Sequence, residues 1–410
     1  MNTWKEIPHD TDFSIYNLPF GIISTGDSDM RIASRIGDEV IDLKAAHIYG
    51  IFDGLGLESG DFIGRSLNKF IKRGKAVTNA VRLRLQEALS DSRSPLTKAQ
   101  GVFIPIQKVL VHMPVEVGDY TDFYSSIEHA TNVGKMFRDP ENALLPNWRH
   151  LPVGYHGRAS SIVPSGTPIK RPMGQTKPAD GPPVYGPSQR LDFELEMAFI
   201  IGKDSELGSP ISTAEAEDYI FGMVLFNDWS ARDIQKWEYV PLGPFLGKNF
   251  ASSVSPWVVT LEALDHFRVQ GPSQEPAVLS YLQYSGQKNY DINLEVAITP
   301  DGGAENVVSR SNFKYMYWNM CQQLAHHTVN GCNMRVGDML ASGTISGKDE
   351  SSYGSMLEIS WAGKNPVTLS DGSQRKFIND GDTVTMRGFG DKDGKRVGFG
   401  KVSGKVLPAG

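Results

Sequence analysis

The spacing of apolar and polar residues predicts a small first unit followed by a larger one. Short strand-like runs, separated by Gly or Asp turns, lie at residues 20–25, 30–37 and 39–46. Residues 50–90 then change to helical spacing. We expect this helical region to bury an apolar face formed by Val81, Leu83, Leu85 and Leu89. Nothing in this first unit suggests chemistry, so its expected role is packing.

The second unit is predicted to be mainly β. Runs of β-rich composition bounded by Gly, Asp, Asn or Pro lie at residues 193–202, 219–228, 255–261, 290–299, 337–347, 355–363 and 382–390. Helical spacing interrupts them near 230–239 and 313–329. Strands that do not alternate regularly with helices argue against a wound βαβ sheet. We therefore expect an all-β roll or sandwich with a few helices.

The boundary between the two units is placed near residue 115, which gives domains 1–115 and 116–410. Residues 164–190 are rich in Pro and Gly, a composition that is also typical of flexible linkers. Strand signals resume at once on both sides of this stretch. We therefore interpret it as a long, ordered surface loop inside the second domain.

Charge and composition exclude several kinds of partner. The 410-residue chain has a formal net charge of −6, so it lacks the basic surface of a nucleic-acid-binding protein. No apolar run is long enough to span a bilayer, and the first residues lack the apolar core of a signal peptide. Its two cysteines, Cys321 and Cys332, are expected to be inert packing residues. A cytoplasmic protein is the simplest expectation.

Two acidic residues stand in a strand that is otherwise apolar. In the run 192–202, alternation places Glu194 and Glu196 on one face and the apolar side chains on the other. Two buried carboxylates side by side need a cation or a raised pKa, and hard oxygen ligands favour Mg²⁺ or Ca²⁺. A solvated strand face is the alternative, and the pattern alone favours that alternative.

A third carboxylate follows the apolar run that begins at residue 221. Asp228 ends that run, and either Asn227 or Asp228 could cap the next helix. Three side chains that share one face of this helix are Arg232, Gln235 and Tyr239. Asp228 is placed to join the two glutamates as a metal ligand. Without other observations, an N-cap residue on a surface helix is the stronger interpretation.

A possible general base lies in residues 118–138. Asp122, Tyr124 and His129 are crowded together there, and histidine is suited to proton transfer near neutral pH. Glu358 is expected on a strand and could orient His129 from a distant part of the chain. An exposed strand glutamate is an equal alternative. Gly343 and Thr344 are expected on a loop between strands.

Six segments together resemble the fumarylacetoacetate hydrolase family. They are residues 118–138, 151–169, 192–202, 221–250, 339–347 and 354–363. Their order and spacing make a chance match improbable, and we expect the similarity to extend over the whole chain. The resemblance implies a small SH3-like β-barrel domain with helices at the N-terminus and a large catalytic β-roll domain after it. It also implies a homodimer.

The resemblance further implies hydrolysis of a carbon–carbon bond in a small β-diketo acid, with Ca²⁺ or Mg²⁺ or both as cofactor. The implied metal ligands are Asp122, Glu194, Glu196 and Asp228, with Lys248 and Ser252 at a further Mg²⁺-associated position. His129 would be the base, held by Glu358. The implied groups around the reacting carbonyl are Arg232, Gln235 and Lys248. The implied substrate contacts are Tyr124, Arg138, Tyr155, Gln235, Tyr239, Gly343 and Thr344.

The chain departs from the family pattern at a few positions without losing a catalytic group. Ser252 stands where the family usually has Thr, and Ile127-Glu128 stands where Arg-Gln is common. Two alternatives stay open at this point. One is a related acylpyruvate hydrolase, decarboxylase or hydratase, and the other is a non-catalytic binding protein that contains a structural metal ion.

Overall fold

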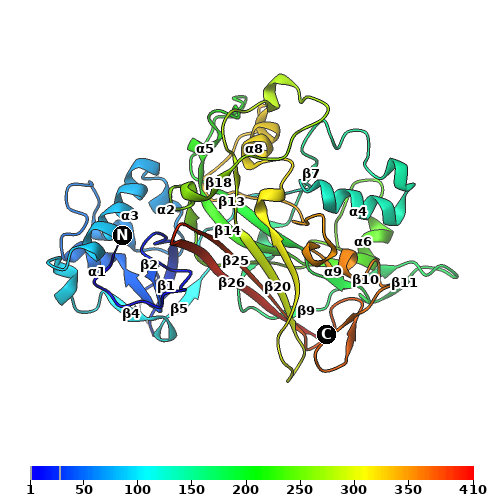
Figure 1. The fold of residues 1–410 in the computed structure, drawn as a ribbon, viewed down its shortest axis with the longest axis horizontal. Helices are drawn as coiled ribbons and strands as arrows, with labels where there is room; N and C mark the ends of the chain where they lie inside the picture. Colours follow the sequence, from blue (N-terminus) through cyan, green and yellow to red (C-terminus); the bar gives the residue numbers. More distant parts are fainter. Residues whose placement is uncertain (1, 27–28) are drawn as a thin grey trace.

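The computed structural model describes residues 2–26 and 29–410, and its first unit is built on one antiparallel sheet (Figure 1). The strand order is β4-β3-β2-β1-β5. The strands are β1 (Phe20–Ser24), β2 (Arg31–Ile36), β3 (Glu39–Asp42), β4 (Phe103–Pro105) and β5 (Leu110–His112). The helices of this unit are α1 (Leu43–Ile48), α2 (Asn68–Ile71) and α3 (Lys75–Ser90). The strand-like runs in the sequence were therefore correctly located, except that the third ends at Asp42, where its side chain caps α1.

Helix α3 corrects one predicted core residue. Val81, Leu85 and Leu89 are fully buried, whereas the side chain of Leu83 is 45% exposed. Positions four apart lie on the same face of an α-helix, and a residue two positions along faces away from it. The apolar face thus excludes Leu83.

An eight-stranded sheet forms the centre of the second unit. Its order is β7-β6-β22-β13-β14-β16-β8, with β17 also paired to β14. The strands are β6 (Tyr120–Phe123), β7 (Gly154–His156), β8 (Ile162–Pro164), β13 (Leu195–Ile201), β14 (Ile220–Asp228), β16 (Ser252–Val254), β17 (Val259–Thr260) and β22 (Met339–Ala341).

A five-stranded sheet packs against one face of this central sheet, and its long C-terminal strands run beside β14 (Figure 1). Its order is β21-β20-β25-β26-β9. The strands are β9 (Ile169–Lys170), β20 (Asn293–Thr299), β21 (Asn306–Asn312), β25 (Thr383–Lys392) and β26 (Lys395–Leu407). The two sheets share one apolar core, to which Met197, Leu225 and Met386 contribute. The predicted face-to-face arrangement of strands is therefore present.

The opposite face of the central sheet packs on the first unit. Phe226 and Ile200 belong to the same apolar cluster as Phe20 and Phe70 of the first unit. Phe20 also stacks on Phe221, with ring centroids 6.1 Å apart. Strands β13 and β14 are consequently buried on both faces, which explains why their sequences are almost continuously apolar.

The remaining elements are short. Four pairs of strands stand outside the large sheets: β10 (Met173–Thr176) with β11 (Val184–Pro187), β12 (Leu191–Asp192) with β15 (Ser230–Ala231), β18 (Arg268–Val269) with β19 (Asn289–Tyr290), and β23 (Val367–Thr368) with β24 (Gln374–Arg375). The helices are α4 (Ile127–Phe137), α5 (Ala216–Tyr219), α6 (Arg232–Glu238), α7 (Leu261–Leu264), α8 (Met320–Thr328) and α9 (Met356–Ile359). Within the described ranges, no helix combines the length and apolar character needed to cross a membrane.

Two expectations about local structure were wrong. Residues 164–190 are not one loop, because they contain β9 and the β10–β11 hairpin. Residues 356–359 form helix α9 instead of a strand. The hydroxyl of Ser355 accepts the amide of Glu358 and so begins the helix. Glu358 therefore lies on a helix and not on the expected strand.

Both cysteines are free thiols; Cys321 is buried and Cys332 is half-buried. Cys321 is buried in α8, and this burial raises the pKa of its thiol to about 12. A thiol with so high a pKa stays protonated and is a poor nucleophile.

Candidate metal centre and active site

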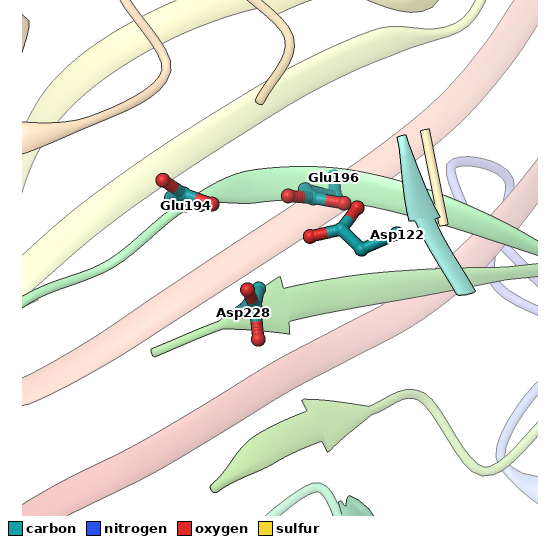
Figure 2. Close-up of side chains that lie close together, drawn as sticks. All are labelled: Asp122, Glu194, Glu196 and Asp228. Atoms are coloured by element: carbon teal, nitrogen blue, oxygen red, sulfur yellow. The ribbon is translucent and has the colours of Figure 1, made fainter. Parts of the chain in front are cut away.

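Four acidic side chains meet in one place, three of them on strands of the central sheet and one on the residue just before such a strand. Asp122 comes from β6, Glu194 directly precedes β13, Glu196 lies in β13, and Asp228 ends β14. Each offers an oxygen within 4.8 Å of the others, and all four residues are buried. Figure 2 shows the carboxylates pointing toward one another. The antiparallel pairing of Leu195 with Asn227 brings the start of β13 to the end of β14 and so produces the meeting point.

The acidic cluster fits a divalent cation. Burial, and then the negative charge of Asp228, raise the pKa of Asp122 well above its usual value. Burial and the neighbouring carboxylates do the same for Glu196. Among the described residues, Oδ1 of Asp122 and Oε1 of Glu196 have no hydrogen-bond partner. Buried, mutually repelling and partly unpaired oxygens are the donor set that a hard divalent ion satisfies.

Two buried cations flank the acidic cluster. Lys248 Nζ lies 2.5 Å from Glu194 Oε2 and 2.7 Å from Asp228 Oδ2. Arg232 Nη1 lies 2.7 Å from Glu194 Oε1. Burial acts to raise the pKa of Glu194, but the charges of Lys248 and Arg232 outweigh it and hold this pKa well below the usual range. Glu194 is therefore ionised even without a metal ion.

Neutral donors hold the other carboxylates. The hydroxyl of Tyr155 lies 2.9 Å from Asp122 Oδ2 and 2.9 Å from Asp228 Oδ2. Ser252 donates its hydroxyl to Asp228 Oδ1 at 2.8 Å, and the amide of Gly343 donates to Glu196 Oε2 at 3.0 Å. One hydroxyl carries one proton, so Tyr155 can donate to only one carboxylate at a time.

A histidine–glutamate pair lies near this centre. His129 Nδ1 is 2.7 Å from Glu358 Oε2, and both side chains are buried. Burial acts to raise the pKa of Glu358, but His129 and the hydrogen bonds from Asn132 and Ser346 outweigh it, so this pKa lies below its usual value and the carboxylate stays ionised. Because Nδ1 is bound to a carboxylate, Nε2 is the nitrogen left to accept a proton.

The remaining predicted site residues divide into those that contact Arg232 or His129 or are buried, and those that are exposed. Gln235 accepts from Arg232 at 3.4 Å, the ring of Tyr124 meets that of His129 edge-on at 5.2 Å, and Thr344 Oγ1 is buried without a partner among the described residues. In contrast, Tyr239 is 52% exposed. Arg138 is also exposed and donates to the carbonyl of Ala143.

Several residues that matter to this geometry were missed in the sequence. Glu358 also accepts hydrogen bonds from Asn132, Ser346 and Ser355. Asp192 pairs with Arg232 Nε at 2.8 Å. Asn132 could have been found, because it stands three positions after His129 on a helix and so shares its face. Ser346 and Ser355 carry no comparable signal.

The predicted capping role of Asn227 or Asp228 was wrong. Helix α6 begins at Arg232 with Ala231 at the N-cap position. Asn227 instead accepts the amide of Glu194 through its side-chain oxygen at 3.1 Å. It thus ties together the two strands at which Glu194, Glu196 and Asp228 of the acidic cluster lie.

The fold, the buried acidic cluster that could hold a divalent cation and the His129–Glu358 pair are together typical of a class of hydrolase. The chain belongs to the fumarylacetoacetate hydrolase family. The family model for the C-terminal region, Fumarylacetoacetate (FAA) hydrolase C-terminal, matches residues 120–406. The model Fumarylacetoacetase N-terminal matches residues 16–114.

The curated relatives match along their full lengths. Fumarylacetoacetase of Homo sapiens is 54% identical over 412 residues, which cover 98% of this chain and 98% of the relative. Fumarylacetoacetase of Caenorhabditis elegans is 51% identical over 100% of both chains. Fumarylacetoacetase of Arabidopsis thaliana is 50% identical over 100% of this chain and 99% of the relative.

Solved structures support the fold. A fumarylacetoacetate hydrolase from Exiguobacterium antarcticum superposes with a TM-score of 0.54 at 18% identity, over 95% of this chain and 99% of that one. A maleylpyruvate hydrolase from Sphingobium superposes with a TM-score of 0.51 at 16% identity, over 95% and 100%. The protein thus has the mixed α/β fold with curled sheets of this superfamily.

Proposed function

We propose that this chain hydrolyses the carbon–carbon bond of 4-fumarylacetoacetate to give fumarate and acetoacetate, the last step of tyrosine and phenylalanine degradation. The observation that carries this proposal is the full-length similarity to fumarylacetoacetases, at 54% identity to the human enzyme. The site supports it, because the buried acidic cluster and the His129–Glu358 pair supply the groups that such a hydrolysis needs.

The residues that would hold the metal ion are Asp122, Glu194, Glu196 and Asp228. A cation bound there would act as a Lewis acid toward the two oxygens of a β-diketone. Their oxygen donors favour Ca²⁺ or Mg²⁺. Lys248 would contribute as a fixed cation, since an ammonium group has no lone pair to donate. Ser252 would steady Asp228 through its hydroxyl.

His129 would act as the general base. Glu358 fixes the imidazole through Nδ1, so Nε2 takes a proton from water. The resulting hydroxide forms a bond to the carbonyl carbon next to the unsaturated acid. The carbon–carbon bond then breaks, and its electron pair leaves with the acetoacetate fragment. The proton held at Nε2 is then transferred to the carbon of the acetoacetate fragment that received the electron pair, so atoms and charge balance.

Arg232, Gln235 and Lys248 would stabilise the negative oxygen that develops during attack. Arg232 supports this role, because its Nη2 is buried and has no partner in the described part of the chain. Preorganised donors of this kind are worth about 10²–10³ in turnover. Ion pairs with Glu194 and Asp228 hold Lys248 at the acidic cluster.

Substrate contacts are assigned to Tyr124, Arg138, Tyr155, Tyr239, Gly343 and Thr344. The unpartnered hydroxyl of Thr344 is a donor that a bound oxygen would satisfy. The charge of Arg138 acts to lower the pKa of Tyr124, although burial raises that pKa more strongly. Both residues are assigned to substrate contact because the family resemblance implies it.

We further infer that residues 1–115 form a small domain of the SH3-like barrel type and residues 116–410 the catalytic β-roll domain. The separate five-stranded sheet and the ranges of the two family models support this division. A homodimer in the cytoplasm remains our expectation from the family resemblance.

A substrate panel tests the proposal. Purified protein is incubated with fumarylacetoacetate, an acylpyruvate and oxaloacetate, and loss of the diketone or keto acid is followed by absorbance. We expect fumarylacetoacetate to be preferred by at least about 10²-fold in kcat/KM. Preference for an acylpyruvate or oxaloacetate would favour the related hydrolase or decarboxylase. No turnover of any compound, with metal bound, would favour a binding protein.

A further inference from the structure

Asp192 contacts both Arg232, which lies beside the acidic cluster, and the helix that carries Glu358. It ends β12, two positions before Glu194, and its side chain is fully buried. The chain that follows it runs beside the segment leading into α9, because the amide of Leu195 donates to the carbonyl of Gly354 at 2.9 Å. Asp192 is therefore at the point where the metal-centre strand and the helix that carries Glu358 come together.

The carboxylate of Asp192 accepts three hydrogen bonds. Oδ1 accepts the amide of Met356 at 2.7 Å, and Oδ2 accepts the amide of Leu357 at 3.0 Å and Arg232 Nε at 2.8 Å. The first two donors belong to the opening turn of α9, whose amides have no partner within the helix. One carboxylate thus binds both a backbone turn and a catalytic cation.

The contact with Arg232 determines which way its guanidinium points. Nε is fixed by Asp192 and Nη1 by Glu194, which leaves Nη2 buried and free among the described residues. A guanidinium is planar and rigid, so fixing two nitrogens fixes the third. Asp192 consequently aims the donor that would meet the developing oxyanion.

The contact with α9 acts on the base. Glu358 follows Leu357 directly, and this helix has only four residues, so it has little internal hydrogen bonding to hold its position. Asp192 anchors the two residues that precede Glu358, and Glu358 orients His129 at 2.7 Å. A small displacement of α9 would therefore misalign the imidazole.

We propose that Asp192 is a positioning residue that holds Arg232 and the Glu358–His129 pair in register with each other. This inference rests on the proposed hydrolysis of fumarylacetoacetate. Asp192 is not among the residues assigned above to the metal site or to substrate contact. Its removal should lower kcat while KM and bound metal stay close to the wild-type values, because the four metal-site carboxylates and the residues assigned to substrate contact remain in place.

The test compares Asp192→Asn with a matched buried aspartate elsewhere. Asp382 is also buried, pairs with Arg375 Nε at 2.7 Å and accepts the amide of Asn379 at 2.9 Å, but it contacts none of the site residues named above. We expect Asp192→Asn to lower kcat by about 10²-fold, the cost of a misplaced catalytic group, and Asp382→Asn to leave kcat unchanged. Metal content, KM and melting temperature are measured on both variants.

A double-mutant cycle separates positioning from general stability. In a Glu358→Gln background, Asp192→Asn should lower kcat by clearly less than it does in the wild-type background, because the alignment of the Glu358–His129 pair is already lost and only the effect on Arg232 remains. A full 10²-fold loss in that background, or a kcat for Asp192→Asn equal to that of Asp382→Asn, would overturn the proposal. Unfolding of both Asp192→Asn and Asp192→Glu would also overturn it and assign Asp192 to folding. An inactive wild-type protein would instead overturn the proposed function.

Discussion

His129 Nδ1 lies 2.7 Å from Glu358 Oε2, although 229 positions separate the two residues in the chain. Each of the two residues lies on a short helix that begins with a serine N-cap. Ser126 caps α4, which carries His129, and Ser355 caps α9, which carries Glu358. The imidazole therefore meets a preformed, ionised carboxylate, and its second nitrogen is left free for a proton.

Replacing His129 by Ala is expected to lower kcat by about 10²–10⁴-fold, the usual contribution of a general base. Metal content should not change, because His129 is outside the set of four carboxylates. His266→Ala is the control, since His266 pairs with Asp393 at 3.1 Å on the surface. Near-normal turnover of His129→Ala would remove this residue from the mechanism.

Asp228→Ala is expected to lose both bound metal and activity. Asp228 is bonded to Lys248, Tyr155 and Ser252, so its removal disrupts several partners of the metal centre at once. Metal per chain is measured by elemental analysis after dialysis. Asp338→Asn, a buried aspartate that accepts the amides of Asp119 and Arg335, should keep its metal. Full metal occupancy in Asp228→Ala would contradict the assignment.

The stability of metal-free protein is expected to fall as pH rises from about 5 to about 8. Burial, with the neighbouring carboxylates, raises the pKa of Asp122 and of Glu196 in the folded state. The folded state then binds more protons than the unfolded state. This contribution is complete below the unfolded pKa of these groups and is lost as pH rises through their folded pKa.

Thermal unfolding with chelator across this pH range measures the effect. Added Ca²⁺ or Mg²⁺ should raise the melting temperature more at about pH 8 than at about pH 5, because a metal ion binds the deprotonated carboxylates. A melting temperature of chelated protein that rises over this range, or a metal effect that is larger in acid, would be inconsistent with these pKa shifts.

Gly343→Ala is expected to damage the site, whereas Gly394→Ala should not. Both glycines have positive φ, +78° and +71°, so each substitution costs about 1 kcal/mol in backbone strain. At Gly343 an added Cβ would also collide with the carbonyl of Phe123, while at Gly394 it would meet open space. The collision adds about 1–3 kcal/mol and displaces the amide that binds Glu196. Equal activity and equal unfolding free energy in both variants would contradict this account.

The acidic cluster was predictable only in part. Strand alternation places Glu194 and Glu196 on one face, and the apolar run of β14 ends at Asp228, so the local pattern makes three of the four acidic residues candidates, although taken alone it favours a solvated strand face and an N-cap. That these strands are neighbours follows only from the pairing of Leu195 with Asn227, which is a tertiary contact.

The α9 region could not be predicted in this way. Residues 355–363 are mostly apolar, and a short apolar run does not distinguish strand from helix. The helix depends on the Ser355 cap and on the carboxylate of Asp192, which is 164 positions from Met356. Contacts between such distant residues leave no local signal, so the role of Asp192 in holding α9 was found only in three dimensions.

The most direct test of the account is the cleavage of fumarylacetoacetate by the wild-type protein before and after chelation. We predict equal amounts of fumarate and acetoacetate from the untreated or metal-restored protein, and loss of both products after the divalent ion is removed. Undiminished formation of both products by protein shown to be free of divalent metal would contradict the central claim.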